Sequence, residues 1–145
     1  MIGGMKMKMY ICTHLVKSED LNHHGTLYAG RMADWFVEGS FIAAARLTGE
    51  PKSIVCAKLH GLKFGRPATK GDIVQLATRV VYAGTTSLTV YGKVTKNDEE
   101  AILVEGFVTF VFVDAEGKKK PHGLYLGEPA NEEDARLREI AKNLR

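Results

Sequence analysis

The chain has 145 residues, a mass of 16.0 kDa and a formal net charge of +3. This length suits one domain with one hydrophobic core, and a composition of 45% hydrophobic and 26% charged residues excludes a disordered chain. The small positive charge suits an anionic ligand and argues against nucleic acid as a partner. No apolar run can span a bilayer and residues 1–12 lack the apolar stretch of a secretory signal, so we expect a cytoplasmic protein that binds no membrane.

The alternation of apolar and polar residues, together with the positions of glycine and proline, predicts the secondary structure along the chain. Residues 5–17 alternate apolar and polar side chains, which indicates a strand. The stretch 28–47 is rich in helix formers and has no proline, and Gly49 offers a stop, so we expect one long helix buried on most sides. Asn131 suits the N-cap of a final surface helix. The remaining expected elements are four strands at 54–64, 72–83, 87–96 and 101–114, and the final helix at 131–145.

The order of these elements favours an α+β fold. A strand, a long apolar helix and four long strands joined by short turns call for an antiparallel sheet that curls around the helix. Such a sheet covers the helix on one side only. The uncovered helix surface and the sheet edges need cover, so we expect a homodimer or a higher oligomer, such as a tetramer or a hexamer.

Three spaced motifs carry a resemblance to a known family. They are Asn-x-x-Gly-x-x-x-x-Gly beginning at Asn22, Phe-x-x-Pro-x-x-x-Gly-Asp beginning at Phe64, and Gly-x-Thr-Ser beginning at Gly84. In this order and spacing, residues 15–121 resemble the acyl-CoA thioesterases of the hotdog fold. The resemblance implies one domain over 1–145, with five or six strands wrapped around a central helix and a helix at 131–145. It also implies dimers that bind acyl-CoA thioesters at the subunit interface.

Thioester hydrolysis needs hydrogen-bond donors for the carbonyl oxygen and a carboxylate that activates water or attacks directly. The segment from Gly25 to Gly30 opens the long helix, whose first N–H groups are unpaired and lie at the positive end of the helix dipole. We therefore expect the backbone near Gly30 to hold the developing oxyanion. In resembling enzymes, an asparagine at the position of Asn22 orients the thioester or the water.

The carboxylate of the family pattern is displaced in this chain. In members of the family, this region resembles a Gly-Gly pair followed, after six further residues, by Asp-Glu. Aligning this chain with that pattern places Val37 at the first acidic position and Glu38 at the second. Glu38 is the expected substitute, with Asp34, one turn earlier, as its competitor. The structural alternative is that Arg31, Asp34 and Glu38 pair with one another along a solvated face.

Two histidines directly follow Asn22. A near-neutral pKa suits His24 or His23 for orienting water or donating to the thioester, and we expect His24 in catalysis and His23 in substrate binding. Adjacent loop side chains usually point in different directions, so at most one is expected to face the site. Loop packing or capping is the alternative for each.

The coenzyme A portion of the substrate carries phosphates, which basic side chains and hydroxyl groups recognise. The expected contacts are Arg66 and Lys118, together with Thr86 and Ser87, because the resemblance places the Gly-x-Thr-Ser turn near the pantetheine channel. A solvated turn is the alternative for the lysine run at 118–120.

Cys12 with His14 and Cys56 with His60 have side chains that bind zinc, but they are spread along strands instead of tight turns. We therefore predict buried, reduced thiols, no metal site and no cofactor beyond the coenzyme A of the substrate. Dehydratases of the same fold resemble one another in a His-x-x-x-Pro-Gly sequence at the start of the helix, and this chain lacks that sequence. A non-enzymatic acyl-CoA binder remains the alternative function, because Val37 replaces the usual acid.

Overall fold

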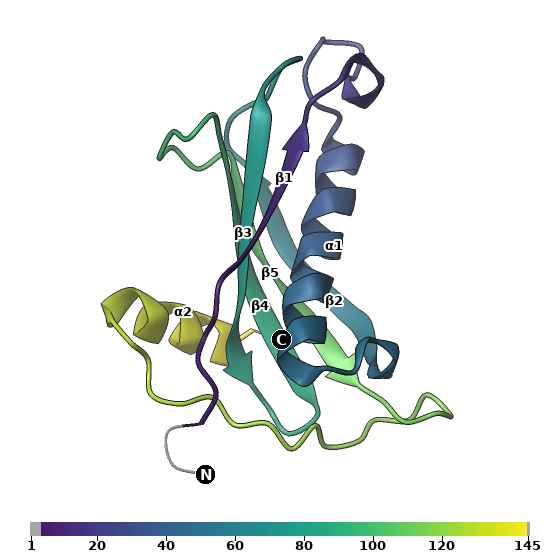
Figure 1. Cartoon of the computed structure of the whole chain (residues 1–145), viewed down its shortest axis with the longest axis vertical. Coiled ribbons are helices and arrows are strands. Elements are labelled where there is room, and N and C mark those ends of the chain that lie inside the picture. The colour runs from purple at the N-terminus through teal and green to yellow at the C-terminus, as the bar shows by residue number, and fades with distance from the viewer. Residues whose placement is uncertain (1–3, 145) are drawn as a thin grey trace.

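The computed structural model describes residues 4–144, which form one five-stranded antiparallel sheet and two α-helices (Figure 1). The strand order is β1-β3-β4-β5-β2, so β1 and β2 are the two edges. The predicted α+β class and the sheet around a long helix are confirmed. The bounds are β1 Tyr10–Leu15, α1 Ala29–Thr48, β2 Ile54–Phe64, β3 Ile73–Ala83, β4 Ser87–Lys96, β5 Val104–Phe112 and α2 Glu132–Lys142.

Helix α1 lies along one face of the sheet and supplies the centre of the core (Figure 1). Its buried residues recur at helical spacing, with Met32, Phe36 and Ala43 at most 3% exposed. A Cβ atom on Gly39 would lie 2.2 Å from a methyl carbon of Leu76, so glycine leaves the room that Leu76 of β3 occupies against α1. The helix ends at Gly49, as predicted, with a left-handed φ of 71°.

The side of α1 that faces away from the sheet is polar and exposed. Arg31, Asp34 and Glu38 are all exposed there. The expectation of a helix buried on most sides therefore fails for this stripe, because the sheet reaches only part of the way around α1. A second chain is the natural source of any further cover.

Helix α2 covers the opposite face of the sheet. Side chains on β3 alternate, so that Leu76 packs under α1 whereas Val81 packs against Leu137 of α2. Asn131 caps the helix as predicted, since its Oδ1 accepts the N–H of Asp134 at 2.8 Å. The Asp134 carboxylate lies 3.2 Å from the Arg79 guanidinium on β3. The expected surface helix is thus docked by an apolar seam and an ion pair.

Strand β1 is shorter than predicted and turns apolar side chains outward. Ile11 and Leu15 on β1 are exposed, as is Met9 just before it, and the register pairs Leu15 with Ile73, which is 53% exposed. These four residues form a patch beyond the reach of α2, which we call the outer-face patch. The patch marks a candidate contact surface.

Strand β2 offers the longer unpaired edge, with eleven residues. Val55, Leu59 and Phe64 are exposed on it, and its pairing with β5 shifts register twice, between Cys56 and Lys58 and between His60 and Lys63. An exposed edge of this length invites pairing with another strand. None of the described helices is long and apolar enough to cross a membrane.

Candidate active site

The turn before α1 is built around the side chain of Asn22. Its Oδ1 accepts the N–H groups of His24 at 2.9 Å and of Thr26 at 3.2 Å. Its Nδ2 donates to the Thr26 hydroxyl at 3.1 Å. A primary amide carries two N–H bonds, so one donor of Asn22 is left for a ligand.

The start of α1 presents unsatisfied donors. Tyr28 occupies the N-cap position and its side chain makes no capping hydrogen bond. Within residues 4–144, the N–H groups of Ala29, Gly30 and Arg31 have no protein acceptor. The Tyr28 ring lies over Gly30, where a Cβ atom would meet it at 2.5 Å. Three N–H groups at the positive end of the helix dipole form a site for developing negative charge.

A cavity of about 270 Å³ lies beside Asn22 and the first turn of α1. Loop 65–68 and the first residue of β5 form its other walls. Asn22 and Arg66 are the predicted site residues that line the cavity. The complete lining is Asn22, Leu27, Ala29, Met32, Phe64, Gly65, Arg66, Pro67, Ala68, Leu103 and Val104.

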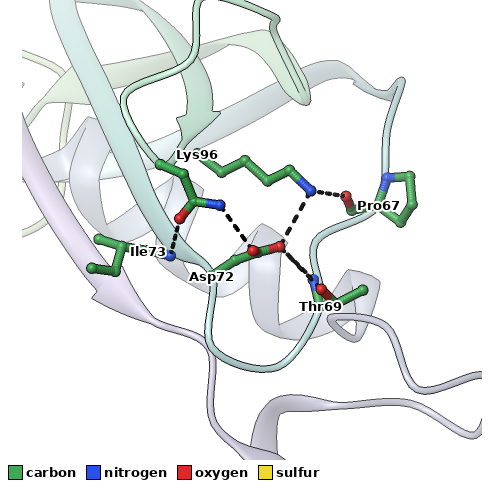
Figure 2. Close-up of polar contacts among 6 residues, drawn as sticks. Pro67, Thr69, Asp72, Ile73 and Lys96 are labelled. Carbon is green, nitrogen blue, oxygen red and sulfur yellow. Dashed lines mark hydrogen bonds and ion pairs between the residues drawn. The ribbon is translucent and has the colours of Figure 1, made fainter.

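Hydrogen bonds fix the cavity wall from both sides. The Leu103 carbonyl accepts the N–H groups of Gly65 at 2.7 Å and Arg66 at 3.3 Å. On the far side, Lys96 donates to the Pro67 carbonyl and pairs with the Asp72 carboxylate at 3.3 Å (Figure 2). The wall is therefore held in place before any ligand arrives.

The Asp72 carboxylate organises the turn between β2 and β3. It accepts the Thr69 N–H at 2.8 Å and the Asn97 side-chain N–H at 2.9 Å (Figure 2). Hydrogen bonds from Thr69 and Asn97, followed by contact with Lys96, lower the pKa of Asp72 to about 2. The Gly-Asp end of the second motif is thus structural, since it holds the loop that bears Arg66.

Neither candidate carboxylate lines the cavity of its own chain. Asp34 and Glu38 are exposed, and no ion pair involves either of them in the described part of the chain. Arg31 instead pairs with Asp20, whose side chain is 4% exposed, at 3.3 Å. The alternative in which Arg31, Asp34 and Glu38 pair with one another is therefore wrong, because a loop residue takes the arginine.

The two carboxylates lie on the same exposed side of α1, one helical turn apart. Asp34 precedes Phe41, which packs edge-on against Phe110 of β5, by seven residues, or about two turns. Glu38 lies three residues after Trp35, which stacks on His14 of β1, and three residues before Phe41, so it points midway between these two contacts. Asp34 is therefore turned about 40° more toward β5 and the β2 edge than Glu38.

The two histidines lie on the rim of the site. His23 and His24 are both exposed and their ring centroids are 3.9 Å apart. Neither lines the cavity. Both side chains are accessible to a ligand that extends out of it.

The remaining predicted contacts lie at the other end of the sheet. Ser87 is seven positions from Val94 on β4, which is about 23 Å at the rise of a strand. Val94 pairs with Val104, which lines the cavity, whereas the Thr86 carbonyl accepts the N–H of Phe112. Lys118 follows β5 at this same end. Within a single chain, therefore, Thr86, Ser87 and Lys118 lie far from Asn22.

Residues 24–103 match the family model of the thioesterase superfamily. The chain belongs to this superfamily. It is 31% identical over 126 residues to YkhA of Bacillus subtilis, an uncharacterized acyl-CoA thioester hydrolase, and the match covers 84% of this chain and 71% of YkhA. The predicted hotdog fold is confirmed by solved structures of such proteins.

Two of these structures are informative about the superfamily. A hexameric acyl-CoA thioesterase solved without ligand is 34% identical, with a TM-score of 0.82 over 92% of this chain and 86% of that one. An acyl-CoA hydrolase from Staphylococcus aureus, solved with butyryl coenzyme A, coenzyme A and coenzyme A disulfide, is 27% identical. Its TM-score is 0.82 over 95% of this chain and 83% of that one.

The zinc alternative does not fit this superfamily member. Cys12 and His14 lie on β1, whereas Cys56 and His60 lie on β2 at the opposite edge of the sheet. Among residues 4–144, no group of three or more metal-binding side chains lies together. Cys56 is exposed in the chain, against the prediction of buried thiols, because β2 has no neighbour on its outer side.

The residues that form the cavity floor were not predicted from the sequence of this superfamily member. Met32, Ala68, Leu103 and Val104 are at most 3% exposed and were not singled out as site residues. Their apolar character gives no signal beyond ordinary core packing. Only the position of Ala68 within the second motif pointed to this loop.

Proposed function

We propose that the protein hydrolyses acyl-CoA thioesters to a free acid and coenzyme A. The observation that carries the proposal is the meeting of three features at one cavity: the spare amide donor of Asn22, the start of α1 with its unpaired N–H groups, where Ala29 lines the cavity and Gly30 follows it, and an apolar interior. The description of the Bacillus subtilis relative and the butyryl coenzyme A complex of the Staphylococcus aureus enzyme support this substrate class.

In the proposed reaction the N–H of Gly30 and the free N–H of Asn22 hold the thioester carbonyl oxygen. A carboxylate removes a proton from water, the hydroxyl adds to the carbonyl carbon, and the carbon–sulfur bond then breaks. The thiolate of coenzyme A takes up the proton. Direct attack by the carboxylate, through an anhydride that water hydrolyses, gives the same products.

The carboxylate is proposed to come from a second subunit, because no carboxylate of residues 4–144 lines the cavity. Asp34 and Glu38 are the two candidates. Asp34 is turned more toward β5 and the β2 edge, where a second chain would pair. Glu38 lies one turn later, about 40° further around α1, and its side chain is one methylene longer. The direction of the side chains favours Asp34 by this small angle, whereas the family pattern favours Glu38.

The second subunit is proposed to pair along β2. An antiparallel pairing about a two-fold axis sets the Phe64 end of one chain beside the Ile54 end of the other. Ile54 pairs with Phe112, whose N–H donates to the carbonyl of Thr86. This pairing would bring Thr86, Ser87 and Lys118 of one chain toward Arg66, His23 and His24 of the other, as a path for the nucleotide of coenzyme A.

The outer-face patch supplies a second contact surface. A hexamer built from dimers needs two kinds of interface, and a hexameric relative is 34% identical to this chain. We propose β2 for the dimer and the outer-face patch for further assembly into tetramers or hexamers. The two free cysteines lie at opposite sheet edges, which favours the reducing cytoplasm as the compartment.

Free-thiol release from a panel of acyl-CoAs, from acetyl to palmitoyl, tests the proposal. We compare wild type with Asn22→Ala, Asp34→Asn and Glu38→Gln, and we use the exposed Glu19→Gln as a control outside the site. Loss of turnover in only one carboxylate variant identifies the working acid. Turnover that survives both substitutions contradicts the carboxylate mechanism.

A non-enzymatic acyl-CoA binder is the second candidate, favoured by Val37 at the usual acidic position and by a cavity without a carboxylate. The same assay separates the two functions. Tight binding of acyl-CoA with no thiol release from any member of the panel would establish the binder.

A further inference from the structure

We infer that the cavity beside Asn22 holds the acyl chain of the substrate and limits it to short and medium length, an inference that rests on the proposed function. The cavity has two chemically different ends. Asn22 and the exposed Arg66 line its mouth, whereas buried Met32 and Leu103 line its floor. A ligand with a polar head and an apolar tail fits this arrangement with the thioester at the mouth and the tail inward.

The volume sets the length of the tail. An apolar cavity of about 150 Å³ holds benzene, with six carbons, so about 270 Å³ holds roughly ten carbon-sized groups. The thioester itself takes some of that space at the mouth. Acyl groups of about four to eight carbons therefore fill the cavity, and a sixteen-carbon chain exceeds it.

The backbone of the floor is held in place by hydrogen bonds, so only a change of side chain lengthens the cavity. The Leu103 N–H donates to the Val94 carbonyl at 2.8 Å, and the Leu103 carbonyl accepts two N–H groups from the opposite wall. Val104 begins β5 and is paired with Val94 of β4. Met32 is the flexible side chain of the floor, because it is unbranched and projects from α1.

Met32 therefore acts as the stop for the chain. Met32→Ala removes three side-chain atoms from the floor and should move the preferred acyl length up by about two to three carbons. Ala68→Leu fills the cavity from the loop side and should move the preference down. Leu88→Ala is the matched control, since Leu88 is equally buried but does not line the cavity.

The test measures kcat/KM for acetyl, butyryl, hexanoyl, octanoyl and palmitoyl thioesters. We expect a rise of about fourfold for each added methylene until the cavity is full, and at least a tenfold fall from octanoyl to palmitoyl. The Met32→Ala profile should move toward longer chains, with no such shift in Leu88→Ala. A wild type that prefers palmitoyl, or a Met32→Ala profile with no shift, would overturn the inference.

Binding of non-hydrolysable S-alkyl coenzyme A thioethers, followed by calorimetry, keeps the inference separate from the proposed function. If affinity rises to S-octyl and falls at S-hexadecyl while no thioester is cleaved, the proposed hydrolysis fails and the length limit stands. If thioesters are cleaved and S-hexadecyl binds most tightly, hydrolysis stands and the length limit fails.

Discussion

The guanidinium Nε of Arg31 lies 3.3 Å from the carboxylate of Asp20, so the first turn of α1 is tied to the segment that precedes it. Asp20 also accepts the Lys17 N–H through its side chain and the Tyr28 N–H through its carbonyl, each at 2.8 Å. One residue thereby holds both ends of the loop that carries Asn22. The helix carboxylates are left available because their nearest basic side chain is engaged.

Asp20→Asn should lower the free energy of unfolding by about 1 to 3 kcal/mol, since a buried charge-assisted contact is lost. Urea denaturation measures this change. Glu19→Gln is the control, because Glu19 is the exposed neighbour. Equal urea midpoints for the two variants would contradict a stabilising role of the Asp20 side chain.

Gly30→Ala should lower thioester turnover by about tenfold or more, because its Cβ pushes the Tyr28 ring aside, into the space that the thioester needs at the helix N–H groups. Stability should change little, since alanine favours a helix over glycine by up to about 1 kcal/mol and offsets the clash. Turnover and thermal melting are measured together. Adding Tyr28→Ala to Gly30→Ala should restore much of the activity beyond that of Gly30→Ala alone; no rescue would show that the ring is not the cause.

Asp72 should make stability depend on pH in the acid range. Its pKa is about 2 in the folded chain and lies below the ordinary value of 3.8, so its ionised form stabilises the fold above pH 3.8. This contribution decreases as pH falls from about 5 toward 2. Asp72→Asn should cost about 1 to 2 kcal/mol at pH 7 and progressively less at pH 4 and 3. Melting curves across this range check the trend, and a constant difference would contradict it.

Leu59→Lys should dissociate the proposed β2 dimer to single chains of 16.0 kDa, because a charge on the β2 edge opposes strand pairing. Ile11→Lys in the outer-face patch should leave the dimer intact and block larger assemblies. Light scattering gives both masses, and thiol release tests whether the single chain is inactive. If the dimer survives Leu59→Lys but not Ile11→Lys, the outer-face patch forms the dimer and β2 forms the further contact, contrary to the proposal.

Turn chemistry made most of the fold predictable. The bounds of β2 and β4 match the predicted 54–64 and 87–96, since glycine, proline and polar clusters delimit both strands. The first strand was predicted too long at 5–17, because the alternation continues into residues that leave the edge of β3: pairing stops at Tyr10 and Thr78, and Met5 forms a bridge with Leu126 instead. The docking of α2 was not predictable, since Arg79 and Asp134 are far apart in sequence.

The candidate site was predictable only where it is local. Asn22 and the donors of α1 belong to one continuous motif, so their meeting follows from the sequence. In the cavity floor Met32 and Leu103 lie together although they are 71 positions apart in the sequence. The identity of an apolar residue does not indicate such a contact. The direction of Asp34 and Glu38 depends on which strand packs on each side of α1, and spacing alone does not give that.

The two register shifts of β2 also bear on which strands can pair with this edge. Each β-bulge bends the strand and sharpens its twist. A bent, twisted edge pairs less readily with the strands of other chains, which is how β-bulges counter edge-to-edge aggregation. The two shifts thus lower the tendency of this eleven-residue edge, with its exposed Val55, Leu59 and Phe64, to add further strands.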